Sequence, residues 1–291
     1  MMVPLRPQFE SFEAVKSILQ RFTLMSFTDS SQANAYASAF QIDRLCVPLD
    51  EDREPPSVPD LLRPVSVSET KPIEPELRDL CRLHWLTLSR RAISVLELGS
   101  GFSTTVIAHG LRILDSFFHD WAKTNVRAAV PFHIHSVEEE RRFLEISSKR
   151  LPPELRPYAT FYRSSVELTV IHSHIATLYS KLPNVCPDFI YLDGPSQFAT
   201  TQELRGFSLA GPERMPMSAD ILTFEFFLQP GTLILVDGRT ANARFLRAHF
   251  KRNWAYRHDE LGDVHLFELQ EEPLGPLNRK QMDFCLSGWL L

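Results

Sequence analysis

The chain is poor in the features that mark several large classes of protein. Its 291 residues include only four cysteines, which are far apart and form no CxxC or Cys/His pattern. We therefore expect reduced thiols and a cytoplasmic protein. No charged-then-apolar leader opens the sequence, and no run of about 18 apolar residues occurs, so neither secretion nor a membrane span is expected.

The chain also lacks an excess of positive charge. Lysine and arginine total 31 against 36 aspartates and glutamates, which gives a formal net charge of −5. Proteins held to nucleic acid through phosphate contacts are usually basic, so no nucleic-acid partner is expected. Apolar residues make up 44% of the chain, which is enough for a sizeable core and argues against general disorder.

The hydrophobic pattern divides the chain into two parts. Helical spacing in residues 9–25 and a proline- and acid-rich stretch at 48–76 predict an N-terminal helical appendage and linker over residues 1–70. Residues 71–291 begin with a predicted helix at about 75–90 and then alternate strands and helices. Strands are predicted at 93–98, 132–137, 159–163, 188–192 and 232–236, with a hairpin within 254–269. This order predicts an α/β, Rossmann-like fold with a mostly parallel sheet and a C-terminal antiparallel hairpin.

The stretch SVLELGSGFSTT predicts a ligand-binding turn between a strand and a helix. Gly99 and Gly101 let the backbone approach a ligand, and Ser103 can cap the helix whose first N–H groups attract an anion. Thr104 replaces the third glycine of a dinucleotide fingerprint, and Glu97 suits a cationic ligand group better than a pyrophosphate. S-adenosylmethionine carries both an ammonium and a carboxylate, so it is favoured over a nicotinamide cofactor. The alternative is a tight turn without a ligand.

Three further strands end in acidic residues. Glu138 follows the run FHIHSV and is predicted to accept hydrogen bonds from ribose hydroxyls, although it lies well beyond the ~20 residues expected of a compact unit. Asp193 follows DFIYL, and Asp237 follows PGTLILV. Because ligands sit at the carboxyl ends of parallel strands, these acids are expected to face a cleft. The alternatives are a solvated helix-start acid for Glu138 and turn residues bonded to their own backbone for the two aspartates.

Five features follow one another over about residues 75–269: E-L-G-S-G-F-S-T, Glu138, D-F-I-Y-L-D-G-P, P-G-T-L-I-L-V-D-G and the terminal hairpin. Together they resemble a class I S-adenosylmethionine-dependent methyltransferase. The segment PMSADILTFEFFLQPGTLILVDGRTANARFL is also similar to largely uncharacterised bacterial proteins, some encoded with surface-polysaccharide genes. The resemblance implies a seven-stranded sheet and no particular substrate. The cofactor contacts it predicts are Glu97, Gly99, Ser100, Gly101, Ser103, Thr104, Glu138 and Asp193.

Two departures from that family pattern bear on the substrate. Ser103 stands at the third motif glycine, as in several small-molecule O-methyltransferases. The sequence D-G-P follows the fourth parallel strand, where many amino-methylating nucleic-acid enzymes have N/D-P-P-Y. We therefore expect O-methylation of a small molecule or a sugar or glycan.

The expected chemistry needs an oriented acceptor and a base for its hydroxyl. Asp193 is the first candidate for that catalytic role and Asp237 the second, while Arg239 and Asn242 are predicted to bind the substrate. The two aspartates are also the place where a divalent cation could bind. No metal is predicted, because Gly238 rather than a further oxygen ligand follows Asp237.

Two other function classes stay open. One is a catalytically inactive cofactor-binding or scaffold protein, and the other is a Rossmann-fold enzyme that uses another cofactor. A homodimer also stays open. The pairs His133/His135 and His172/His174 have the spacing of metal ligands but no evident third ligand, and His265 is interpreted as structural.

Overall fold

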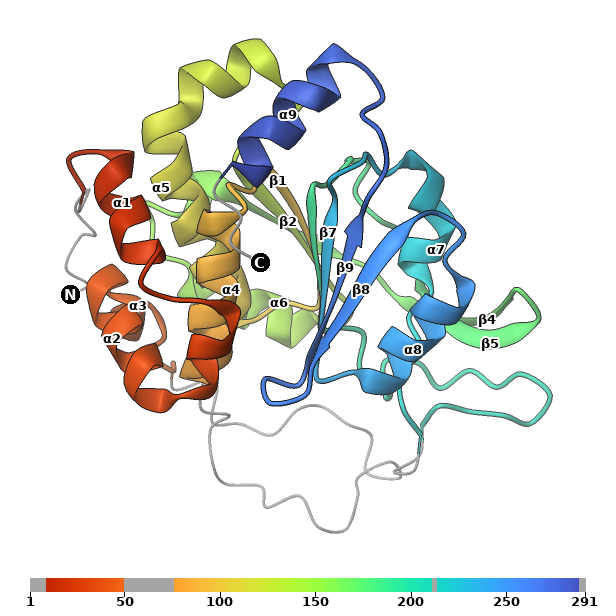
Figure 1. The fold of residues 1–291 in the computed structure, drawn as a ribbon. Coiled ribbons are helices and arrows are strands. Elements are labelled where there is room, and N and C mark those ends of the chain that lie inside the picture. The colour runs from red at the N-terminus through yellow and green to blue at the C-terminus, as the bar shows by residue number, and fades with distance from the viewer. Residues whose placement is uncertain (1–8, 50–75, 211–213, 288–291) are drawn as a thin grey trace.

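A seven-stranded sheet forms the centre of the molecule. The computed structural model describes residues 9–49, 76–210 and 214–287. The strand order is β3-β2-β1-β6-β7-β9-β8, and β9 runs in the direction opposite to the other six strands (Figure 1). The strands are β1 (Ser94–Leu98), β2 (His133–Glu138), β3 (Ala159–Arg163), β6 (Phe189–Leu192), β7 (Leu233–Asp237), β8 (Trp254–Asp259) and β9 (Val264–Leu269). The predicted α/β class, with its antiparallel C-terminal hairpin, is confirmed.

A separate antiparallel hairpin and two layers of helices surround this sheet (Figure 1). The hairpin is β4 (Val166–Ile171) with β5 (His174–Tyr179). Helices α4, α5 and α9 cover one face of the sheet, and α7 and α8 cover the other (Figure 1). The helices after residue 76 are α4 (Leu77–Ser89), α5 (Phe102–Asn125), α6 (Arg141–Arg150), η4 (Arg156–Tyr158), α7 (Asp220–Phe224), η5 (Glu225–Phe227), α8 (Thr240–His249) and α9 (Pro276–Leu286).

The alternation of side chains along each strand creates two hydrophobic cores, one on each face. On the α4 side, Val95 and Tyr191 pack with residues of α4 and α5. On the α8 side, Ile190 and Val236 pack with Leu246 of α8 and with neighbouring residues. The position of a residue in its strand therefore determines whether its side chain lies on the α4 side or the α8 side of the sheet. The same alternation determines the side on which the strand-end acids lie.

The N-terminal helices share the α4-side core rather than standing apart. They are α1 (Phe12–Leu19), η1 (Leu24–Thr28), α2 (Ser30–Phe40) and α3 (Ile42–Leu45). The Trp85 indole donates a hydrogen bond to the backbone oxygen of Leu19 at 3.2 Å, and the Tyr36 hydroxyl lies 2.8 Å from His84 Nδ1. The predicted domain boundary at residue 70 and most of the proline-rich linker lie outside the described residues.

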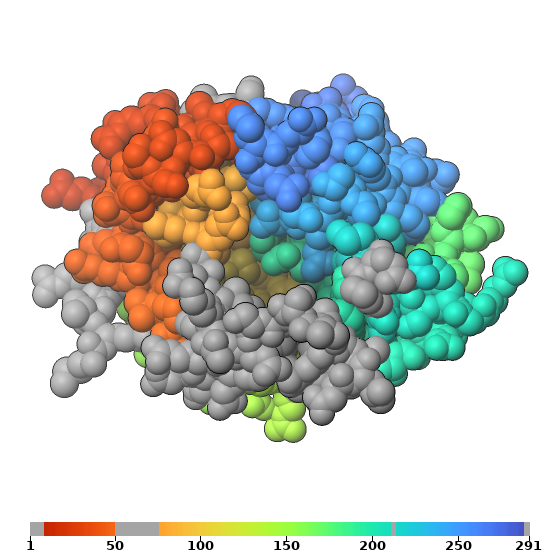
Figure 2. Space-filling model, turned by 90° about the horizontal axis from the view of Figure 1, so that it is seen from below, coloured from red at the N-terminus to blue at the C-terminus, as the bar shows by residue number. Residues whose placement is uncertain are grey.

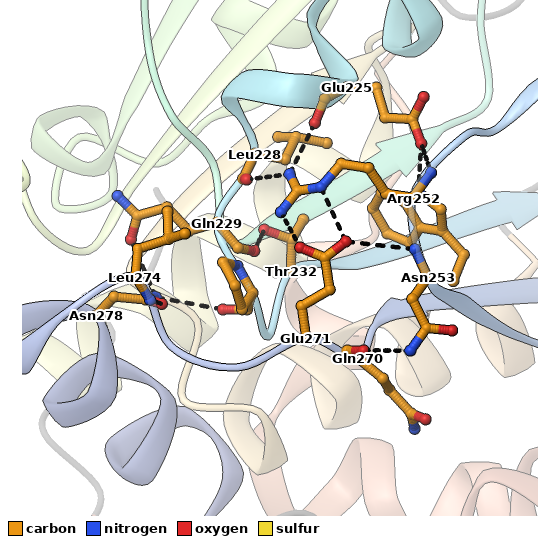
Figure 3. Close-up of polar contacts among 12 residues, drawn as sticks. Glu225, Leu228, Gln229, Thr232, Arg252, Asn253, Gln270, Glu271, Leu274 and Asn278 are labelled. Atoms are coloured by element: carbon orange, nitrogen blue, oxygen red, sulfur yellow. Dashed lines mark hydrogen bonds and ion pairs between the residues drawn. The ribbon is translucent and has the colours of Figure 1, made fainter.

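A network of hydrogen bonds and an ion pair joins the loops at the amino end of β7. The Arg252 guanidinium donates to the backbone oxygens of Glu225 and Leu228 and pairs with the Glu271 carboxylate at 2.5 Å (Figure 3). The strand register places this network at the end of β7 opposite to Asp237. Arg252 therefore joins η5 to the segments flanking β8 and β9, away from the predicted site.

Two further expectations concern the described part of the chain. All four cysteines are free thiols, and only Cys186 is exposed. Within residues 9–49, 76–210 and 214–287, no helix combines the length and the apolar character needed to cross a bilayer.

Candidate functional site

The two glycines of the turn after β1 have different roles. Gly99 has a φ of +99°, and a Cβ atom there would lie 2.8 Å from the backbone nitrogen of Gly194. Gly101 has extended backbone, and the nearest atom to its Cβ position is Ser103 Oγ at 3.6 Å. The fold itself therefore requires glycine at position 99, whereas position 101 has room for a Cβ atom.

Four carboxylates converge at the carboxyl ends of the neighbouring strands β2, β1, β6 and β7. Glu97 is in register with Ser136 of β2 and Tyr191 of β6, on the α4 side of the sheet. Side chains two residues apart on a strand point to the same face of the sheet. Glu138 and Asp193 lie two residues after Ser136 and Tyr191, and Asp237 ends β7, so these three carboxylates are also on the α4 side. The structure thus brings four predicted residues to one edge and one face of the sheet.

Glu97 is fully buried, and its carboxylate is only partly satisfied. Thr104 Oγ1 donates to Glu97 Oε2 at 2.6 Å, while Oε1 has no hydrogen-bond partner among the described residues. Burial raises the pKa of Glu97 to about 7, and the nearby hydroxyls of Ser103, Ser136 and Thr104 oppose that rise. Thr104 is therefore a support for Glu97 rather than a substitute for a glycine at the helix start. A buried oxygen without a partner is suited to a donor group from a ligand.

Glu138 links β2 to the glycine turn. Its Oε2 accepts hydrogen bonds from the backbone nitrogen and the hydroxyl of Ser100, at 2.8 and 2.9 Å, and its Oε1 accepts from the backbone nitrogen of Glu140 at 2.9 Å. Burial, followed by the charge of Glu139, raises the pKa of Glu138 to about 8. The predicted ribose acceptor thus also orders the turn, and only its Oε1 keeps a further lone pair, since Oε2 already accepts two hydrogen bonds.

Asp193 is accessible and is held in place by Arg239. Its side chain is 54% exposed, and Arg239 Nε lies 3.6 Å from its Oδ1. Arg239 also donates to the backbone oxygens of Asp193 and Pro195. Burial of the surrounding region raises the pKa of Asp193, and the Arg239 charge opposes the rise. Arg239, predicted to bind substrate, therefore positions the turn that carries Asp193.

Asp237 faces two charged residues of α4. Its Oδ2 accepts a hydrogen bond from the buried Tyr191 hydroxyl at 2.7 Å, and burial followed by the Asp193 charge raises its pKa to about 6. Burial and then the Asp237 charge raise the pKa of Asp79 to about 7. Arg82 pairs with Asp79 at 2.7 Å and donates to the backbone oxygen of Gly262 at 3.0 Å. Three mutually repelling carboxylates thus share this region with one buried arginine.

Asp193 and Asp237, with Asp79 and Arg82 of α4, line a cavity of about 370 Å³, whereas Glu97 and Glu138 are not part of its lining. Figure 2 views the face on which the parallel strands end, and the surface is hollowed between α4 and the β8–β9 hairpin. The lining residues are Phe27, Glu76, Arg78, Asp79, Arg82, Asp193, Asp237, Gly238, Leu261, Gly262 and Asp263. A cavity of this size and polarity accommodates a polar small molecule or part of a larger one.

Other predicted residues lie outside the cavity lining. Asn242 is fully buried, and its side chain accepts from the nitrogen of Ser218 at 3.0 Å and donates to the oxygen of Ser218 at 2.9 Å. Its amide is thus engaged in joining α8 to the segment before α7, and we leave it out of the proposed substrate contacts. His133 and His135 lie within 3.0 Å of hydroxyls on β3, at Thr160 and Tyr162.

Sequence reasoning missed the contribution of α4 and of the β8–β9 turn. Asp79 and Arg82 belong to a helix that was predicted only through its apolar leucines. Their spacing of three residues indicates a helical ion pair, but nothing local indicates that the pair faces the end of β7. Leu261, Gly262 and Asp263 carry no motif that marks them as part of a site.

Comparison with known proteins adds no family to this description. No protein-family model matches the chain, and no curated protein matches it.

Proposed function

We propose that the chain is an S-adenosylmethionine-dependent methyltransferase that acts on a hydroxyl of a small molecule or a glycan. The observation that carries the proposal is the convergence of Glu97, Glu138 and Asp193 beside the turn containing Gly99 and Gly101. They lie on a seven-stranded sheet that ends in an antiparallel hairpin, which is the sheet that the family resemblance implies.

The residues present fit that cofactor. Glu97 offers a buried oxygen without a partner, which suits an ammonium group. Glu138 Oε1 has acceptor capacity left for a ribose hydroxyl, and the absence of a side chain at Gly101 allows close approach of a ligand to the backbone. A dinucleotide pyrophosphate is disfavoured beside Glu97, because an acid at this end of the turn repels phosphate.

The acceptor would lie in the 370 Å³ cavity that adjoins Asp193. When bound, the cofactor supplies an electrophilic methyl group. Asp193 is proposed to accept the proton of the acceptor hydroxyl, since its carboxylate is accessible and its raised pKa makes it a stronger base than an ordinary aspartate. Arg239 holds this carboxylate in place, and Asp237 is restrained by Tyr191.

Calorimetric titration of the full chain with S-adenosylmethionine, S-adenosylhomocysteine and NAD tests the cofactor. We expect binding of the first two and none of NAD. Gly101→Val should abolish that binding in a protein that still folds, because the nearest atom lies 3.6 Å from the Cβ position and valine at the N-cap of α5 costs only about 1 kcal/mol. Thr124→Val, at an exposed position near the far end of the same helix, is the matched control and should bind as the wild type does.

A turnover assay on candidate hydroxyl acceptors separates an enzyme from an inactive binding protein. NAD binding in place of S-adenosylmethionine would favour a nicotinamide-dependent enzyme. Wild-type affinity in folded Gly101→Val would remove the glycine turn from the cofactor site.

A further inference from the structure

The β8–β9 hairpin brings together three side chains that the proposed methyl transfer does not use. His258 and His265 are opposite each other in the antiparallel register, and their rings stack with centroids 4.0 Å apart and planes 13° apart. Asp263 lies in the turn that joins the two strands. One ligand atom from each residue lies within 4.8 Å of the other two.

Two of these three side chains are available to a ligand. Within the described part of the chain, neither the His258 ring nor the Asp263 carboxylate has a hydrogen-bond partner. His258 is half-buried and Asp263 is exposed, so an ion can reach both from solvent once the His258 ring turns out of its stack with His265, because the in-plane nitrogens of parallel rings do not converge on one ion. We propose that His258, Asp263 and His265 form a binding site for a divalent transition-metal ion, with zinc the best fit.

The donor set selects this class of ion. Two imidazole nitrogens with one carboxylate oxygen suit zinc and other late first-row ions, whereas magnesium and calcium favour sites made of oxygen ligands. Zinc bound by three protein ligands keeps a fourth position for water or another molecule. The site is distinct from the aspartates Asp193 and Asp237, which offer only oxygen.

The surroundings of His265 restrain its ring as metal-binding histidines are usually restrained. The ring is fully buried, with the Tyr256 hydroxyl 2.9 Å from Nδ1 and the Thr240 hydroxyl 3.0 Å from Nε2. One nitrogen would exchange its hydroxyl for the ion, and the other would keep its partner and hold the ring in orientation. Arg244 is the nearby cation whose charge acts on His265, and its exposure to solvent weakens the repulsion of an ion.

The position of the site gives the ion a consequence for the cavity. The backbone oxygen of Asp263 accepts from the Gly238 nitrogen at 2.8 Å, and Gly262 holds Arg82 through its backbone oxygen. These turn residues form one wall of the 370 Å³ cavity. An ion on Asp263 and the two histidines would therefore fix the wall that faces Asp237.

The test uses the full chain after treatment with a chelator. Zinc titrated by calorimetry should bind with one equivalent, and the melting temperature should rise by about 5 °C when zinc is in 100-fold excess over its Kd. Cobalt should give the visible bands of a four-coordinate ion. Loss of a residue that only supports a metal ligand weakens binding roughly 10- to 100-fold. Loss of a ligand itself, in His258→Gln or Asp263→Asn, should weaken zinc binding by at least that much.

His249→Gln is the matched control, because His249 belongs to a different histidine cluster with His172 and His174. It should bind zinc as the wild type does. Asp263 is exposed, so Asp263→Asn keeps the test valid if His258→Gln fails to fold. The proposal fails if the wild type does not bind zinc, if Asp263→Asn binds with wild-type affinity, or if only His249→Gln loses binding. None of these outcomes depends on methyltransferase activity.

Discussion

Replacing the buried Glu97 by glutamine should stabilise the protein at high pH and impair cofactor binding. The pKa of Glu97 rises from its ordinary value of 4.5 to about 7 because the side chain is fully buried. The folded protein therefore keeps the proton over a range of pH in which the unfolded chain has already lost it. The stability associated with protonated Glu97 is full below about pH 4.5 and is lost as the pH rises toward 7.

The size of the effect follows from this shift. One unit of pKa shift corresponds to about 1.4 kcal/mol, so ionised Glu97 should cost the wild type about 2–3 kcal/mol more of its unfolding free energy at pH 8 than at pH 5. Glutamine does not ionise and should not show that loss. The difference in unfolding free energy between Glu97→Gln and the wild type should therefore grow by about 2–3 kcal/mol between these two pH values.

Urea denaturation of both proteins at several pH values measures this difference. Comparing how the unfolding free energy of each protein changes with pH removes any pH-independent cost of placing an amide beside Thr104. Glu145→Gln, an exposed change on α6, is the control and should show little dependence on pH. A pH-independent difference for Glu97→Gln would refute the argument that Glu97 is a buried, strained acid. Unimpaired S-adenosylmethionine binding would separately remove Glu97 from the cofactor site.

Three further predictions concern the same edge of the sheet. Gly99→Ala should lower the unfolding free energy by about 2–4 kcal/mol, because the φ of +99° and the contact with Gly194 both oppose a side chain; a melting curve like that of the wild type would contradict this. Glu138→Gln should weaken S-adenosylmethionine binding about ten- to 150-fold by calorimetry, and a change below about twofold would leave Glu138 as a support for Ser100 alone. Asp193→Asn should slow turnover by about 10²–10⁴ with cofactor affinity nearly unchanged, whereas preserved turnover per folded molecule would exclude a role as base.

The amino-acid sequence was sufficient to predict the sheet and the glycine turn. Short apolar runs that end in glycine or an acid gave β1, β2, β6 and β7 within one or two residues of their observed bounds. These signals are local, because strand length, side-chain alternation and turn chemistry depend on neighbouring residues. The β4–β5 hairpin was missed, since its alternation is short and much of it is polar or exposed.

Only the tertiary structure decided how the candidate site is arranged. Burial of the Glu97 carboxylate, the use of Asn242 by Ser218, and the approach of Asp79 to Asp237 all depend on contacts between distant segments. The pairing of His258 with His265 likewise depends on the register of the hairpin, which places two separated imidazoles face to face. Local sequence determines which side chains can face a given side of a strand or helix. Packing decides what they meet there, because solvent exclusion and charge proximity are set by elements far apart in the chain.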